Sequence, residues 1–89
     1  MHLEGEIILI KETGLIGTRG FQKRELVLKT TEKGRGQKIL IEFQQVYVDL
    51  LDAYRVGDIV QISIDIRGRK WQDRYFTAIV GWKIENASM

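Results

Sequence analysis

Between Ile59 and Arg67, apolar and polar side chains alternate strictly from Val60 onward, and this alternation constrains the fold more than any other feature. Successive side chains of a β-strand point to opposite faces, so the segment is predicted to be a strand with one buried and one solvated face. The inward set is Val60, Ile62, Ile64 and Ile66, and the outward set is Gln61, Ser63, Asp65 and Arg67. The chain must therefore supply other strands that cover the apolar side.

Two more strands are predicted to form a hairpin around a tight polar turn at residues 32–36. The first strand spans Phe21 to Thr31 and the second Gln37 to Phe43, each with alternating side chains. Their inward residues are Leu26, Leu28, Ile39, Ile41 and Phe43, and their outward residues are Phe21, Lys23, Glu25, Val27, Lys29, Lys38, Leu40 and Glu42. Val27 and Leu40 are expected to be cross-strand neighbours.

The two ends of the chain carry less regular strand patterns. In the first strand, from about Leu3 to Lys11, Gly5 indicates a bulge or a close approach of backbones. Residues 13–20 contain three glycines and are predicted to be a loop. The last strand runs from about Arg74 to Ile84, and two registers are open. One places Ile79 and Gly81 inward, the other places Phe76, Val80 and Trp82 inward, and a bulge would reconcile them.

Apolar residues recur at spacings of three and four between Gln44 and Tyr54, which predicts one short helix. The order is then strand, strand, strand, helix, strand, strand. Five strongly twisted strands tend to close on themselves, and a helix between the third and fourth is the OB arrangement. The predicted fold is an all-β, five-stranded OB-type Greek-key barrel, with an SH3-like barrel as the alternative. One domain is expected over residues 1–85, with a frayed C-terminus at 86–89.

Composition excludes several classes of function. The chain has 89 residues and no cysteine, so it fits a single domain without disulfides, thiolate metal sites or a cysteine nucleophile. His2 is the only histidine, so neither a metal site nor a Ser–His–Asp triad is predicted, and no enzyme activity or cofactor is expected. No apolar run is long enough to cross a bilayer and the N-terminus lacks a basic leader, so a cytoplasmic protein is expected.

Segments along nearly the whole chain resemble the OB domains of the single-stranded-DNA-binding-protein group. They resemble more closely a family of short bacterial proteins classed as a domain of unknown function. The matching segments are residues 3–5, 23–28, 39–43, 49–52, 56–60, 75–77 and 82–85. The resemblance implies an OB fold, nucleic-acid binding and assembly into dimers or tetramers. Proteins of the single-stranded-DNA-binding group carry an acidic C-terminal tail that recruits partners, and partner recruitment by that route is not expected from residues 1–89.

The segment from Arg67 to Arg74 combines basic residues with one tryptophan. Arg67, Arg69, Lys70 and Arg74 supply charge that can neutralise phosphates, and Trp71 can stack on an unpaired base. Residues 68–73 are predicted to form a hairpin loop, one of the two loops with which OB folds hold oligonucleotides. In the alternative interpretation, Trp71 folds back on the barrel and the arginines only solubilise the loop.

Further contacts are expected at the first loop and on the outer face of the hairpin. Arg19, Lys23 and Arg24 lie where the chain leaves the first loop, and Tyr75 is predicted to point outward as a second stacking platform. Phe21 and Lys38 would add a base contact and a phosphate contact on the hairpin face. Glu25 and Glu42 on the same face oppose phosphate, so a mixed-charge solvated face is an alternative.

Two functions remain open. In the first, the protein binds single-stranded nucleic acid through basic loops and aromatic stacking, with DNA as the expected ligand and RNA left open. In the second, it is an interaction module that self-associates through the hairpin face around Phe21, Val27 and Leu40. The two are compatible, because a dimer or tetramer would extend a binding groove.

Overall fold

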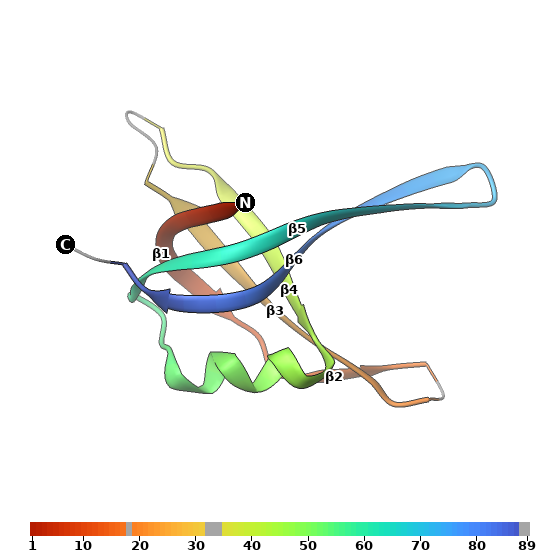
Figure 1. Cartoon of the computed structure of the whole chain (residues 1–89), viewed down its shortest axis with the longest axis horizontal. Coiled ribbons are helices and arrows are strands. Elements are labelled where there is room, and N and C mark those ends of the chain that lie inside the picture. Colours follow the sequence, from red (N-terminus) through yellow and green to blue (C-terminus); the bar gives the residue numbers. More distant parts are fainter. Residues whose placement is uncertain (18, 32–34, 88–89) are drawn as a thin grey trace.

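A computed structural model describes residues 1–17, 19–31 and 35–87 (Figure 1). In the described ranges it contains six strands and one 3₁₀-helix. They are β1 (His2–Ile10), β2 (Gly14–Ile16), β3 (Phe21–Thr30), β4 (Lys38–Gln44), η1 (Gln45–Ala53), β5 (Ile59–Trp71) and β6 (Arg74–Asn86). The turn expected at residues 32–36 lies partly outside the described residues.

The sheet closes into a ring. Its strand order is β1-β5-β6-β4-β3-β2, and β1 also pairs with β3. All pairings are antiparallel except β4 with β6, where Glu42 lies beside Val80 and Phe43 beside Gly81. The ring of β1, β5, β6, β4 and β3, with a helix between the third and fourth of these strands in chain order, is the predicted five-stranded OB-type barrel. The SH3-like alternative lacks a helix at this position.

Gly5 is where the ring closes. It pairs with Val60 of β5 and with Thr30 of β3, so β1 passes from one half of the barrel to the other at this residue. A Cβ on Gly5 would lie 2.1 Å from the carbonyl oxygen of Lys29, so only glycine fits. The close approach predicted from the sequence is confirmed. A β-bulge follows between Ile7 and Leu9, and it turns Leu9 to the outer face.

The core fills the barrel with branched aliphatic side chains and one phenylalanine. The predicted inward residues Leu26, Leu28, Ile41 and Phe43 are fully buried. Val60, Ile62 and Ile64 lie against them from β5. The pairing of Val27 with Leu40 is also as predicted. Alternation therefore identified the buried faces of β3, β4 and the first half of β5.

The predicted helix is present, but its turns are of the 3₁₀ type. Its buried residues are Val48 and Leu51, three positions apart, which matches the three-residue turn of this helix. Val46, which α-helical spacing placed with the apolar residues, is instead exposed. Arg24 fixes η1 to the barrel, because its guanidinium lies 2.7 Å from Asp52 Oδ1 and also donates to the carbonyl of Lys11.

A bulge in β6 settles the register that the sequence left open. Ser63 pairs with Lys83 but Ile64 pairs with Gly81, so Trp82 is the extra residue. Val80 and Gly81 are both buried, on opposite sides of the strand, and the phenyl ring of Phe43 packs where a Gly81 side chain would lie. Of the residues that the second register placed inward, Val80 is buried but Trp82 is not. The bulge leaves it half-exposed, as is Tyr47 on the helix.

Two segments predicted as loops are strands. Residues 14–16 pair with β3 as β2, and the tight turn that follows uses positive φ angles at Gly17 and Gly20. The fourth strand does not end at Arg67, because β5 and β6 remain paired as far as Trp71 and Arg74. Only Gln72 and Asp73 form the turn, with Gln72 in the left-handed region.

The extension carries Ile66 out of the barrel. It was predicted to point into the core but is 58% exposed, because no opposite wall exists at its level. At the C-terminus fraying was expected from residue 86, but β6 includes Asn86 and the N–H of Ala87 donates to the carbonyl of Ile59; the last two residues of the expected tail lie outside the described residues. In the described ranges no helix is long and apolar enough to cross a membrane.

Candidate nucleic-acid interface

The outer parts of β5 and β6 form a two-stranded ribbon, residues 65–79, that leaves the barrel and is called the arm (Figure 1). Directly paired residues of an antiparallel ribbon share a face. One face therefore carries the pairs Arg67–Ala78, Arg69–Phe76 and Trp71–Arg74, and the other carries Ile66–Ile79, Gly68–Thr77 and Lys70–Tyr75. The basic and aromatic residues are thus divided between two faces.

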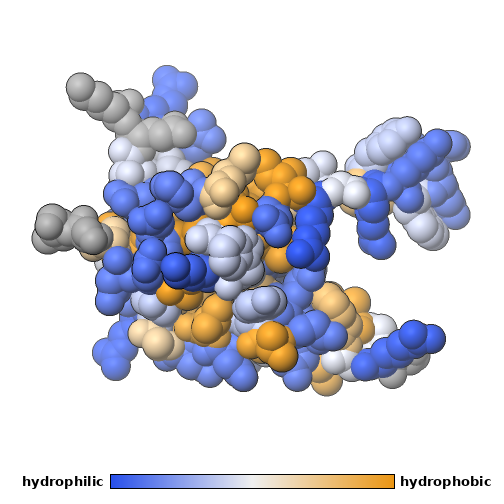
Figure 2. All heavy atoms as spheres, in the orientation of Figure 1, coloured by the Kyte–Doolittle hydropathy of each residue, from blue (hydrophilic) through white to orange (hydrophobic). Residues whose placement is uncertain are grey.

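The first of these faces lines a groove of about 670 Å³ between the arm and the β2–β3 hairpin. Figure 2 shows the arm and the hairpin as two separate projections with open space between them, the arm being mostly hydrophilic. The lining residues come from all the surrounding strands: Ile16, Phe21, Lys23, Glu42, Gln44, Arg67, Gly68, Arg69, Phe76, Thr77, Ala78 and Val80. The groove therefore lies between the two elements that OB folds use to hold oligonucleotides.

An aromatic ring and a cation lie close together on each side of the groove. The guanidinium of Arg69 lies 5.7 Å from the centre of the Phe76 ring, on the groove side of the arm. Across the groove stand Phe21 and Lys23 at the start of β3. Arg67 lies 3.8 Å from Asp65, and both side chains are more than half exposed, so this ion pair leaves the guanidinium open to a ligand. Flat apolar rings beside exposed cations can accept a base and its phosphate together.

A carboxylate lies in the floor of the same groove. Glu42 accepts a hydrogen bond of 2.9 Å from the side-chain amide of Gln44. Within the described ranges it has no ion pair with a lysine or arginine. It opposes phosphate at this point, as the sequence indicated. The cations of the groove are therefore concentrated on the arm and at Lys23.

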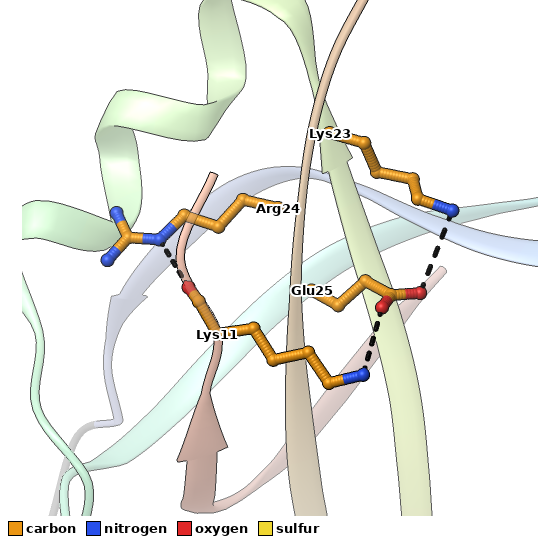
Figure 3. Close-up of polar contacts among 4 residues, drawn as sticks. All are labelled: Lys11, Lys23, Arg24 and Glu25. Carbon is orange, nitrogen blue, oxygen red and sulfur yellow. Dashed lines mark hydrogen bonds and ion pairs between the residues drawn. The ribbon is translucent and has the colours of Figure 1, made fainter. Parts of the chain in front are cut away.

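Lys23 is only partly available. Figure 3 shows Lys11 and Lys23 pointing at Glu25 from its two sides, with nitrogen–oxygen distances of 3.2 and 3.8 Å. The longer contact, to Lys23, is the weaker of the two. Arg24 points the opposite way, toward η1, and takes no part in the groove.

The structure brings together only part of the predicted site. Phe21, Lys23, Arg67 and Arg69 line the groove. Trp71 and Arg74 continue the groove face to the tip of the arm, where Trp71 is 57% exposed and does not fold back on the barrel. Three predicted residues stand apart from these. Lys70 and Tyr75 share the opposite face of the arm, with the Lys70 ammonium 5.7 Å from the Tyr75 ring, and Lys38 is at the far end of β4.

Arg19 is exposed in the turn between β2 and β3, on the other side of the groove from the arm. The sequence favoured Tyr75 over its neighbour Phe76 as the outward aromatic, and Phe76 was missed as a groove residue. If the turn is taken as Gln72–Asp73 and antiparallel partners are counted outward from it, Phe76 lies opposite Arg69. That signal was hidden because the segment was interpreted as a longer loop. In the described ranges no cluster of His, Cys, Asp or Glu could hold a metal ion.

Comparison with known proteins places this architecture in a family. The profile of DUF3127, described as a domain of unknown function, matches residues 2–85. The chain belongs to the DUF3127 family. No protein of curated function matches the DUF3127 chain in sequence.

This DUF3127 domain is similar to two solved structures of small proteins. The dimeric N-terminal domain of PriB from Thermoanaerobacter tencongensis superposes with a TM-score of 0.70 at 14% identity, covering 100% of this chain and 96% of that one. A small single-stranded DNA-binding protein from Streptomyces coelicolor gives a TM-score of 0.49 at 10% identity, covering 98% and 92%. At such identities the first similarity establishes the OB fold, and the second adds nothing to it.

Proposed function

We propose that this DUF3127 domain binds single-stranded nucleic acid, with DNA as the first ligand to test, in the groove between the arm and the β2–β3 hairpin. Binding is non-catalytic in this proposal. The observation that carries it is the ladder of Arg67, Arg69 and Phe76 on the arm, facing Phe21 and Lys23 across the groove. Cations next to exposed rings provide the two interactions that an unpaired strand offers: phosphate charge and free base faces.

The mechanism begins with electrostatic capture. Arg67 and Arg69 on the arm and Arg19 on the hairpin attract the backbone and release its counterions. Bases then stack on Phe76 and Phe21 inside the groove and on Trp71 at the tip. A duplex offers no free base face, because its bases are already stacked, so the groove favours single strands.

The test is a titration of a fluorescently labelled oligo-dT with the protein at two salt concentrations, following anisotropy and tryptophan fluorescence. We expect binding that weakens steeply with salt, with quenching of Trp71 at the arm tip. Unlabelled RNA and duplex DNA serve as competitors that define the nucleic-acid class. Absence of binding at low salt and high protein concentration would refute the proposal.

A matched pair of substitutions tests the groove itself. Phe76→Leu removes a ring from the groove face, and Tyr75→Leu removes the neighbouring ring from the opposite face of the arm. Loss of one stacking contact is worth about 1–3 kcal/mol, so we expect Phe76→Leu to weaken binding and Tyr75→Leu to leave it unchanged. Equal losses from both variants would show that the ligand does not lie in the groove.

A further inference from the structure

The outer face of β1, β3 and β4 is organised in three parallel rows that run across the strands. The middle row is apolar and consists of Leu9, Val27 and Leu40, which are successive cross-strand partners. A charged row lies on each side of it. One holds Lys11, Glu25 and Glu42, and the other holds Glu6, Lys29 and Lys38. On every strand, the two charges that flank the apolar residue have opposite sign.

Within one chain this arrangement is favourable between β1 and β3, where Glu6 lies opposite Lys29 and Lys11 pairs with Glu25, but it is unfavourable between β3 and β4. Glu25 lies directly opposite Glu42, and Lys29 lies directly opposite Lys38, and like charges in such positions repel. Glu25 is compensated by Lys11 and Lys23. In the described ranges, neither Lys29 nor Lys38 has an ion pair with a carboxylate, and Glu42 has only the amide of Gln44. The face therefore carries uncompensated charge on both sides of an exposed apolar row, in which Leu9 and Leu40 are nearly half exposed.

We propose that this face binds the same face of a second copy of the chain, about a twofold axis parallel to the apolar row. This axis is perpendicular to the strands. It stacks each strand on the same strand of the second copy, with the two strands running in opposite directions. Each apolar residue then meets its own equivalent. Lys11 meets Glu6 of the second copy, Glu25 meets Lys29, and Glu42 meets Lys38. Every charge on the face meets the opposite charge, in six contacts related in pairs by the axis.

The charges also select this axis over the alternative. A twofold axis parallel to the strands would bring β1 onto β4, so that Lys11 meets Glu42 and Glu6 meets Lys38. It would also place Glu25 on Glu25 and Lys29 on Lys29 of the second copy, which is repulsive, whereas the axis along the apolar row has no repulsive contact. Face-to-face sheets pack with their strands within about 30° of each other, so rows only three residues long stay in register despite the twist. The face thus specifies both its partner and the geometry of pairing.

This dimer does not rest on the proposed nucleic-acid binding, but it bears on it. Lys38 of the second copy would neutralise Glu42, the carboxylate in the floor of the groove. Lys38, which lies away from the groove of its own chain, would then contribute to the groove of the other. The apolar row is short, so we expect a reversible dimer rather than a permanent one.

Sedimentation velocity across a range of protein concentrations, without nucleic acid, tests the dimer. We expect a concentration-dependent monomer–dimer equilibrium. Leu40→Asp should weaken it at least about tenfold, because the substitution places a carboxylate in the apolar row. The control is Leu15→Asp, which replaces an even more exposed leucine on β2, outside the face, and should leave the equilibrium unchanged. A monomer at all concentrations, or equal effects of the two substitutions, would overturn the proposal.

A charge-swap experiment tests whether opposite charges on β3 and β4 hold the two copies together. The double variant Lys29→Glu/Lys38→Glu makes the β3 and β4 positions of both rows acidic, and Glu25→Lys/Glu42→Lys makes them basic. Neither variant should dimerise alone, whereas an equimolar mixture should form a heterodimer at least as stable as the wild-type dimer. Because both variants must be folded to associate, recovery in the mixture excludes misfolding as the cause of the loss. If the mixture stays monomeric, the proposed pairing of rows is wrong.

Discussion

The two halves of the β5–β6 ribbon share a backbone geometry but differ in what surrounds them. In the barrel half, Val60, Ile62 and Ile64 are almost completely buried by the opposite wall of the ring. In the arm, successive side chains from Ile66 to Lys70 still point to opposite faces, but they are exposed on both faces. The comparison shows that two strands can stay paired beyond the point at which their side chains are buried. The part of the ribbon released from the core is the part that carries the groove's arginines and the ring of Phe76.

The largest expected effect is the difference in the free energy of unfolding between substitutions in the barrel half and in the arm half of the ribbon. Ile62 and Ile66 lie on the same strand and the same side, but Ile62 is fully buried and Ile66 is 58% exposed. Ile62→Ala should lower the free energy of unfolding by about 4 kcal/mol, because it opens a cavity in the barrel. Ile66→Ala should lower it by less than about 1 kcal/mol. Urea denaturation measures both, and similar losses would mean that the arm packs against the barrel in solution.

A pair of glycines makes the second comparison. A Cβ on Gly5 would collide with backbone atoms of Lys29, whereas a Cβ on Gly68 in the arm would make an ordinary contact of 3.7 Å with the Phe76 carbonyl oxygen. We expect Gly5→Ala to destabilise the fold by about 3 kcal/mol and Gly68→Ala to be neutral. The midpoint of thermal unfolding by circular dichroism reports both. A stable Gly5→Ala variant would show that the ring does not close at this residue.

The third prediction concerns the arm tip, where a substitution should lower nucleic-acid affinity without changing the stability of the fold. Trp71→Ala removes an exposed ring that the barrel does not contact, so unfolding should be unchanged while oligo-dT affinity falls by about 1–3 kcal/mol. Arg69→Gln on the same face should lower the salt dependence of binding, by about 0.7 in the slope of log affinity against log salt. Unchanged affinity for Trp71→Ala would remove stacking at the tip from the mechanism.

The smallest effect compares an ion pair of the barrel with one of the arm. Arg24 is largely buried and lies 2.7 Å from Asp52, whereas Arg67 and Asp65 are both exposed and 3.8 Å apart. Asp52→Asn should cost about 0.5–1 kcal/mol of stability, a modest figure because Asp52 itself is 69% exposed. Asp65→Asn should cost nothing measurable in a urea titration. The reverse order would contradict the assignment of Arg24 as the residue that fixes η1.

The sequence predicted the barrel well and the arm poorly, for one physical reason. Alternation reveals a strand when one face is buried, as for Leu26, Leu28 and Ile41. In the arm neither face is buried, so Gly68 and the cluster of charges indicated a loop. The position of Phe76 on the groove face follows from the two-residue turn at Gln72–Asp73, which has no glycine to mark it. The extra residue at Trp82 depends on contacts between β5 and β6 that no local pattern encodes.

Closure of the ring at Gly5 also has a consequence for how the chain folds. Gly5 must pair with both Thr30 and Val60 before the ring closes. The barrel is therefore complete only after segments far apart in the sequence have been brought together. The arm pairs residues that are close in sequence around a tight turn, which is the fastest kind of strand pairing to form. Its amide hydrogens, which no core covers, should nevertheless exchange with solvent before those of the ring. The ribbon is thus expected to be among the first parts of the molecule to form and, at its outer end, among the first to open.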